Sequence, residues 1–245
     1  MNYMQTLHVN PENIKGTEIE ITGDDHGHLI RALRKKPGDR LTVSCEGTGF
    51  CCEVGKVGDD SAILKIICDH AVSGEPGIKI CLYQAIPKGD KMDMIIQKAV
   101  ELGVGAIYPI ETKRVVVKLD QGKRKAKAER WSRIAKESAQ QCGRSVVPEI
   151  HDIIGFDDAV NIAAGSSFCI FPYELEHERH IKDLDIEDET VFSVFIGPEG
   201  GFDDAEVKTV VSRGITPVSL GTRILRTETA TLAVLSILMH IKGEI

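Results

Sequence analysis

Long apolar runs are absent from this chain, so no membrane-spanning helix is predicted. The longest candidate, residues 230–241, is a dozen positions interrupted by Thr231, Ser236 and His240, whereas a span needs about 18 apolar residues. We expect a buried C-terminal helix there instead. The first residues, Met-Asn-Tyr-Met-Gln, also lack the apolar core of a secretory signal. We therefore expect a cytoplasmic protein without a membrane partner.

The cysteine spacings typical of a disulfide framework or a zinc site are missing as well. The chain has seven cysteines, an odd number, and no C-x-x-C pair, so neither a disulfide framework nor a zinc site is predicted. Most of the cysteines lie in apolar runs, as Cys81 does, and are expected to be small core residues in a reducing compartment. His26 and His28 have no further ligands clustered around them, so no metal is predicted.

The common phosphate-binding and hydrolytic motifs are also lacking. Neither G-x-x-x-x-G-K-[ST] nor G-x-G-x-x-G occurs, and no Ser/His/Asp or Cys/His order indicates a nucleophilic triad. His177 and His180 fall in an acidic stretch, where a solvated residue is the simplest interpretation. No histidine therefore stands out as a general base.

The composition is that of a folded globular protein. At 245 residues, with 42% hydrophobic and 27% charged residues, the chain can form one large domain or two modest ones. Its net charge of −7 argues mildly against nucleic-acid binding, but residues 113–144 hold eleven Lys or Arg against three Asp or Glu. Local charge sets the field that a polyanion meets. Two interpretations stay open: an RNA-binding surface, or a solvated helix face.

The strand and helix patterns divide the chain in two. Residues 1–72 carry short strand-like segments separated by glycine turns, and they predict a small β-barrel. One helix is expected there over residues 24–33, with Asp24 as its N-cap, and residues 73–77 are typical of a linker. From residue 78, strands alternate with helices, which predicts a mainly parallel sheet covered by helices. The expected strands are 78–85, 106–110, 146–150, 167–172, 191–196 and 217–220, and the expected helices are 90–102, 126–141, 156–163, 203–213 and 227–242.

Two turn segments near the C-terminus are the most informative feature. Residues 195–202 read FIGPEGGF and residues 219–230 read SLGTRILRTETA, and each lies between a strand-like run and a helical pattern. That layout points backbone N–H groups at a ligand. Glu199 would repel a phosphate and suits a cationic ligand or ribose hydroxyls, whereas Gly221 permits close backbone approach. The apolar walls would be Leu220, Ile224 and Leu225. Taken singly, each segment is also explained by an ordinary turn and helix cap.

Together, the two segments resemble the cofactor loops of SPOUT-class methyltransferases, and GPEGGF followed by SLGxRILRxETA is similar to the RsmE family in particular. The resemblance implies an α/β domain with a SPOUT-type trefoil knot over residues 78–245 and a PUA-like, RNA-binding β-barrel over residues 1–72. It implies S-adenosylmethionine as cofactor and N3 of a uridine in 16S, small-subunit ribosomal RNA as target. The implied partner is this RNA in an assembled or partly assembled 30S subunit, and the implied oligomer is a homodimer. Another RNA target and an inactive, RNA-binding assembly factor stay as alternatives.

The resemblance also implies roles for individual residues. Arg226 and Glu199 are the expected catalytic residues, with Arg226 meeting the RNA or the uracil carbonyls. The expected cofactor contacts are Tyr173, Ile196, Gly197, Pro198, Gly200, Leu220, Gly221, Ile224 and Leu225. The expected RNA contacts are Arg31, Arg34, Lys88, Arg114 and Arg144. Val115 stands where the family often has Ser, which puts any role of that hydroxyl in doubt. A general base and stabilisation of the uracil anion by an arginine both stay open.

Overall fold

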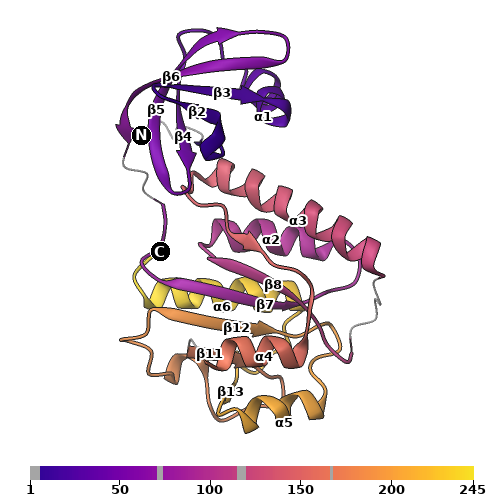
Figure 1. Ribbon diagram of the computed structural model, residues 1–245. Helices are drawn as coiled ribbons and strands as arrows, with labels where there is room; N and C mark the ends of the chain where they lie inside the picture. Colours follow the sequence, from indigo (N-terminus) through magenta and orange to yellow (C-terminus); the bar gives the residue numbers. More distant parts are fainter. Residues whose placement is uncertain (1–5, 71–73, 115–119, 166–167) are drawn as a thin grey trace. The chain divides into compact units, whose positions relative to one another are not determined.

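The computed structural model describes residues 6–70, 74–114, 120–165 and 168–245, and the chain forms two compact units (Figure 1). Unit 1 contains Met1–Glu75 and Lys136–Val147, and unit 2 contains Pro76–Ala135 and Pro148–Ile245. The sequence pattern placed residues 136–147 in the second domain. The structure instead assigns them to unit 1. Three positions discussed above lie outside the described residues: Val115, position 73 of the expected linker and position 167 of an expected strand.

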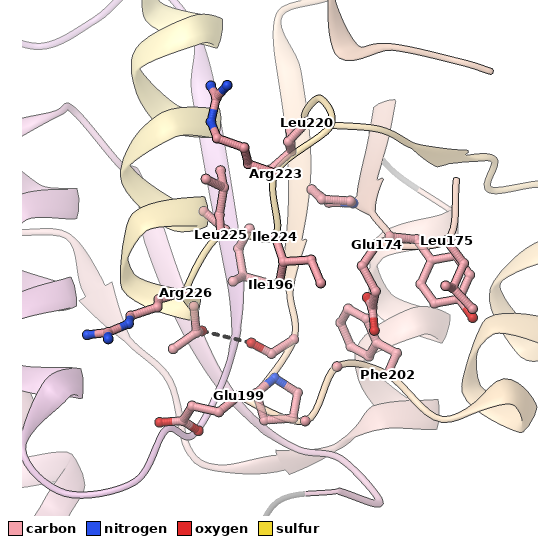
Figure 2. A pocket seen from close by; sticks show the side chains of 18 of the residues that line it. Glu174, Leu175, Ile196, Glu199, Phe202, Leu220, Arg223, Ile224, Leu225 and Arg226 are labelled. Carbon is pink, nitrogen blue, oxygen red and sulfur yellow. Dashed lines mark hydrogen bonds between the residues drawn. The ribbon is translucent and has the colours of Figure 1, made fainter. Parts of the chain in front are cut away.

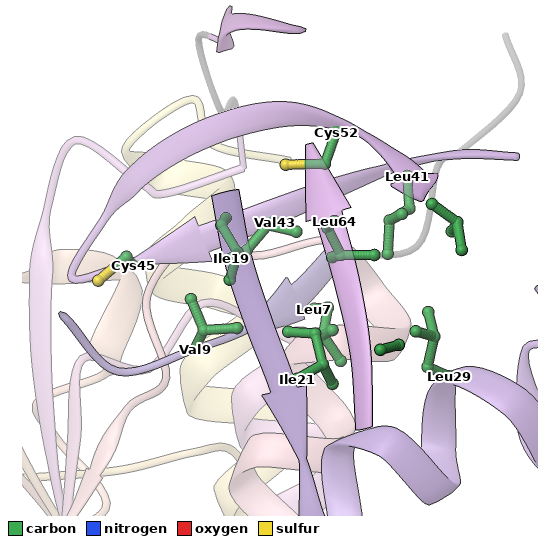
Figure 3. Packing of buried hydrophobic residues seen from close by; sticks show 12 residues of the cluster. Leu7, Val9, Ile19, Ile21, Leu29, Leu41, Val43, Cys45, Cys52 and Leu64 are labelled. Atoms are coloured by element: carbon green, nitrogen blue, oxygen red, sulfur yellow. The ribbon is translucent and has the colours of Figure 1, made fainter. Parts of the chain in front are cut away.

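Unit 1 is built on a six-stranded sheet with the order β1-β4-β5-β6-β3-β2. β1 and β4 are parallel, and every other neighbouring pair is antiparallel. Successive side chains of a strand point to opposite faces, and the apolar ones gather in the core of Figure 3, where Leu7, Ile19 and Leu64 are fully buried. The strands are β1 (Thr6–His8), β2 (Ile14–Lys15), β3 (Glu18–Thr22), β4 (Arg40–Cys45), β5 (Thr48–Val57) and β6 (Ser61–His70).

Short helical segments interrupt the strands of unit 1. The turn η1 (Pro11–Asn13) precedes β2, and α1 (Gly23–Gly27) continues into a π-helical turn, η2 (His28–Ala32). The predicted helix over residues 24–33 is therefore confirmed, but its N-cap is Thr22 and not Asp24. Gly23 has a φ of 59°, a backbone angle that glycine adopts without strain. The helix consequently begins directly at the end of β3.

The carboxylate of Glu75, paired with the buried Arg144, holds residues 136–147 in unit 1. Glu75 accepts hydrogen bonds from Nη2 of Arg144 at 2.7 Å and from the backbone N–H of Ser145 at 2.8 Å. Ser44, in β4, donates to the C=O of Ser145 at 2.6 Å. These contacts join segments about 70 and 101 positions apart. A local sequence pattern does not record such distant pairings, so the division drawn from it assigned this segment to the second domain.

Unit 2 contains a seven-stranded sheet in which every pair of neighbours is parallel. The order is β10-β8-β7-β12-β11-β13, and β9 also pairs with β8. The strands are β7 (Lys79–Ala85), β8 (Ala106–Glu111), β9 (Glu149–Ile150), β10 (Ile154–Gly155), β11 (Phe168–Pro172), β12 (Val191–Ile196) and β13 (Pro217–Val218). The mainly parallel sheet predicted from the sequence is confirmed. Because parallel strands end at one edge, the segments that follow β11, β12 and β13 meet there.

Helices cover both faces of this sheet (Figure 1). α6 packs against α2 and β12, while α4 packs against α5 and β11. Successive side chains of strand β7 point to opposite faces of the sheet. Tyr83 belongs to the core that includes Phe156 of α4, whereas the next residue, Gln84, forms hydrogen bonds with Thr227 and Thr231 of α6. The helices are α2 (Lys91–Glu101), α3 (Gln121–Cys142), α4 (Phe156–Ala164), α5 (Asp204–Ser212) and α6 (Thr227–Ile241), and a short turn η3 (Ile181–Asp183) precedes β12. Within the described ranges, no helix is long and apolar enough to cross a membrane.

Candidate functional site

A pocket of about 620 Å³ lies at the carboxyl ends of β11, β12 and β13 (Figure 2). Three segments line it: the segment after β11, the loop after β12 and the loop that leads from β13 to α6. Every residue predicted for catalysis or cofactor binding lines this pocket, namely Tyr173, Ile196, Gly197, Pro198, Glu199, Gly200, Leu220, Gly221, Ile224, Leu225 and Arg226. The structure therefore brings the two predicted loops together with the segment of Tyr173, which was also predicted to contact the cofactor.

Glycines shape the loop after β12. Gly201 has a φ of 67°, and its N–H donates to the C=O of Pro198 at 2.9 Å. A Cβ at Gly201 would lie 2.1 Å from Oε1 of Glu174, and a Cβ at Gly197 would lie 3.1 Å from the ring of Phe202. The backbone angle explains glycine at Gly201, and close packing against the ring of Phe202 explains it at Gly197.

The loop between β13 and α6 leaves space and unpaired backbone groups. Gly221 has a φ of 110°, and a Cβ there would meet no atom within 4 Å. Ile224 is 87% exposed, although it lines the pocket together with Leu220 and Leu225. The N–H groups of residues 222–225 form no hydrogen bond with any described residue. Open space, apolar side chains and free N–H groups suit a partly apolar ligand that is held through backbone groups.

A buried polar network joins the two loops. Thr227, the first residue of α6, donates from Oγ1 to the C=O of Gly197 at 2.7 Å, the bond marked by the dashed line in Figure 2. The same hydroxyl accepts a hydrogen bond from Nε2 of Gln84 at 3.0 Å, and Oε1 of Gln84 accepts one from Thr231 at 2.7 Å. The N-cap of α6 is Arg226. Thr227 is therefore not the cap of this helix, and its hydroxyl bonds to the neighbouring loop instead.

The two predicted catalytic residues extend on the same side of the pocket, opposite the segment after β11 (Figure 2). Arg226 is exposed. Glu199 lies 3.1 Å from Nζ of Lys91 and accepts a hydrogen bond from the backbone N–H of Lys88 at 3.2 Å. Burial acts to raise the pKa of Glu199, but hydrogen bonds from its own N–H and from Lys91 outweigh this effect and lower the pKa. The carboxylate is thus ionised and already paired with an ammonium group.

The predicted RNA contacts do not share one environment. Arg31 and Arg34 are exposed in unit 1, and Lys88 and Arg114 are exposed in unit 2. Arg114 also donates from Nη1 to the C=O of Gly200 at 3.0 Å, so it contacts the first loop of the pocket directly.

Arg144 differs from the other four. Its side chain is only 5% exposed and is paired with Glu75. Because breaking such a buried pair leaves an uncompensated charge, this arginine has a structural role in unit 1. The geometry gives no support to the RNA contact predicted for it.

Several residues of the site were not predicted. Leu175, His177, Thr222, Arg223 and Ala230 also line the pocket. Most of them are direct neighbours of predicted residues, so a wider window around the same motifs would have included them. His177 was interpreted as a solvated residue. It is exposed to solvent, and it also lines the pocket. Lys91, which does not line the pocket, had no sequence signal that linked it to Glu199.

Comparisons with known proteins agree with this geometry. The family described as RNA methyltransferase domain matches residues 74–239. Ribosomal RNA small subunit methyltransferase E of Bacillus subtilis is 35% identical over 232 residues, which are 91% of this chain and 90% of that protein. The protein of the same name from Synechocystis is 31% identical over 231 residues, which are 91% of this chain and 73% of that protein.

Two solved structures extend the likeness to the fold. The structure of a methyltransferase from Legionella pneumophila in complex with bound SAM has a TM-score of 0.89 and 31% identity, and the match covers 97% of this chain and 98% of that one. A ribosomal RNA small subunit methyltransferase E from Neisseria gonorrhoeae, bound to S-adenosyl methionine, has a TM-score of 0.87 and 29% identity, with coverage of 97% and 98%. The chain therefore belongs to the RNA methyltransferases, within the family named ribosomal RNA small subunit methyltransferase E, or RsmE. The resemblance found in the sequence is confirmed.

Proposed function

We propose that this protein is an S-adenosylmethionine-dependent methyltransferase that methylates N3 of a uridine in 16S ribosomal RNA. The observation that carries the proposal is the pocket in unit 2, because every residue predicted for the cofactor lines this one cavity of about 620 Å³. That volume lies in the usual range for small-molecule sites. Family membership supports the assignment, and two related structures hold this cofactor.

The pocket residues suit the proposed cofactor. Ile196, Leu220 and Leu225 offer apolar contacts to an adenine ring, and the unpaired N–H groups of residues 222–225 can bond to its polar edge. Gly221 leaves open space beside the loop. When bound, the cofactor supplies a methyl group on a positively charged sulfur. The remaining contacts, Tyr173 and the turn Gly197–Gly200, would enclose the rest of the molecule.

The chain would supply position and charge to the reaction. Holding N3 of the uridine in line with the methyl group accounts for most of the rate in such a transfer. N3 must lose its proton before or as it accepts the methyl group, and negative charge then develops on the uracil oxygens. We assign stabilisation of that charge to Arg226, an exposed guanidinium at the mouth of the pocket. Glu199 acts through the loop that it holds, since its carboxylate is paired with Lys91.

Recognition of the RNA is assigned to both units. Arg31 and Arg34 would contact its backbone from unit 1, whose sheet we propose to be a PUA-like barrel, and Lys88 and Arg114 would do so from unit 2. The proposal includes the trefoil knot of SPOUT domains and a cytoplasmic homodimer that acts on an assembled or partly assembled 30S subunit. We assign the dimer interface to the last helix, α6. Leu235, Leu238 and Met239 are already buried within the chain, so the interface would use other residues of that helix.

Calorimetry with S-adenosylmethionine tests the cofactor assignment. Gly221→Val should weaken binding by about tenfold or more, the equivalent of about 1.4 kcal/mol, because the side chain enters open space in the pocket loop. Gly214→Val is the matched control: Gly214 also has a positive φ, 78°, with no atom within 4 Å of a Cβ, but it lies outside the pocket. Equal affinity in wild type and Gly221→Val would reject the site.

Mass spectrometry of ribosomal RNA tests the target. RNA from cells that lack the gene should lose one N3-methyluridine in the small subunit and regain it with the wild-type gene. Loss of a different modification would indicate another RNA site. An unchanged RNA from a protein that binds no cofactor would instead favour the inactive assembly factor.

A further inference from the structure

Lys91 contacts acidic residues that belong to both pocket loops. Its Nζ lies 3.1 Å from Oε1 of Glu199 and 3.3 Å from Oε2 of Glu228. Glu199 is part of the loop after β12, and Glu228 lies in the first turn of α6, two residues after Arg226. Lys91 itself is the first residue of α2. A single ammonium group therefore joins two segments that are 29 positions apart in the sequence.

Glu228 depends on this ammonium group. Its side chain is 16% exposed, and its Oε2 is buried without a hydrogen bond to any described residue. Lys91 is its ion-pair partner in the described part of the chain. Burying a carboxylate without a cation is costly, so the position of Lys91 constrains where the first turn of α6 can lie. The hydrogen bond to Glu199 raises the pKa of Lys91, which keeps the amine charged at neutral pH.

Among the described residues, two side-chain links join the loops. The first is the hydrogen bond from Thr227 to the C=O of Gly197 at 2.7 Å. A single hydrogen bond acts as a pivot, about which one loop can rotate against the other. The bridge from Glu199 through Lys91 to Glu228 is a second link, and two links remove this freedom. Arg226 lies directly before Thr227, so its orientation follows from both.

We propose that Lys91 is a positioning residue, which holds the loop of Glu199 and the start of α6 in the geometry that binds the cofactor and directs Arg226 at the uracil. The inference deepens the proposed function and rests on it for the identity of the ligands. Lys91 touches neither ligand in this account, because it does not line the pocket. Its effect is transmitted through two carboxylates.

The test compares Lys91→Met with Lys91→Arg and with Lys98→Met. Lys98 is the matched control, since it lies on the same helix and pairs with Glu101 at 2.8 Å, away from the pocket. Lys91→Met should raise the Kd for S-adenosylmethionine about tenfold, a typical coupling within a charge network, and should lower kcat on small subunits. Lys91→Arg should restore most of both. Wild-type Kd and kcat in Lys91→Met, or an equal loss in Lys98→Met, would overturn the proposal.

Hydrogen exchange of the ligand-free protein separates this inference from the proposed function. Lys91→Met should speed exchange of amides in residues 197–203 and 222–230, and Lys98→Met should leave them unchanged. Adding Glu228→Gln to Lys91→Met should return part of the protection, because the buried charge is then gone. If these amides exchange equally fast in all variants, Lys91 holds nothing. If they respond while the wild type fails to bind S-adenosylmethionine, the function is wrong and the linkage stands.

Discussion

Replacing Thr227 by valine tests the network that joins the two pocket loops. Thr227 is 4% exposed, and valine keeps its branched shape while it removes the hydroxyl. The variant loses the donor to Gly197, at 2.7 Å, and the acceptor for Gln84, at 3.0 Å. The Nε2 group of Gln84 keeps a second acceptor, the C=O of Ala85 at 2.9 Å. The C=O of Gly197 therefore carries most of the cost.

Leaving such a group unpaired costs about 1–3 kcal/mol, and we expect a loss of about 2 kcal/mol for Thr227→Val. For a chain of this size, each kcal/mol lowers Tm by about 2–4 °C, so calorimetric unfolding should begin about 4–8 °C lower. Thr227→Ser is the control, because it retains the hydroxyl and loses only a methyl group, at about 1 kcal/mol. If the valine variant unfolds at the wild-type temperature, or if serine costs as much as valine, the hydroxyl does not hold the loops together.

Three further predictions concern single residues. Burial lowers the pKa of His8 from 6.5 to about 4. In that range the unfolded chain binds a proton at this residue more readily than the folded chain. The free energy of unfolding should therefore fall by up to about 3 kcal/mol as the pH is lowered from 6.5 to 4. Urea titrations across that range should show His8→Phe without this slope. Glu75→Gln removes the carboxylate that pairs with the buried guanidinium of Arg144. Urea unfolding should show that the free energy of unfolding falls by about 3 kcal/mol. Lys15→Gln, which breaks an exposed pair with Glu20, should lower it hardly at all. Gly201→Ala places a side chain at a φ of 67° and Gly243→Ala places one at a φ of 71°, so each should cost about 1–2 kcal/mol of backbone strain in urea unfolding. The added Cβ of Gly201→Ala would lie 2.1 Å from the carboxyl end of Glu174, which is exposed and can rotate away. A clearly larger loss for Gly201→Ala than for Gly243→Ala would contradict this reasoning.

Local patterns in the sequence were sufficient where local forces decide the structure. Residues 191–196 form the predicted strand without any shift of its ends, because an apolar run of this length, rich in β-branched and aromatic residues, is typical of a buried strand and too short for a helix. α5 begins at Asp204, one residue after the predicted start, and Asp203 is its N-cap, whose side chain accepts a hydrogen bond from the N–H of Ala205. Gly103 directly follows the helix predicted over residues 90–102, and its φ of 84° favours glycine at such a helix end. The two loop motifs also identified the family and, with Tyr173, the lining of the pocket.

The sequence by itself thus determined the class of fold, most strands and helices of unit 2, and the loops that form the pocket, since these follow from periodicity, capping and backbone angles. The short strand β10 was not predicted. Tertiary structure alone decided how distant groups pair. It placed Lys136–Val147 in unit 1 and buried Arg144 against Glu75, although the family resemblance implied an RNA contact for Arg144. It also paired Glu199 with Lys91. The physical reason is that ion pairs and buried hydrogen bonds depend on which surfaces meet after folding, and a charge in the sequence does not record the distance to its partner.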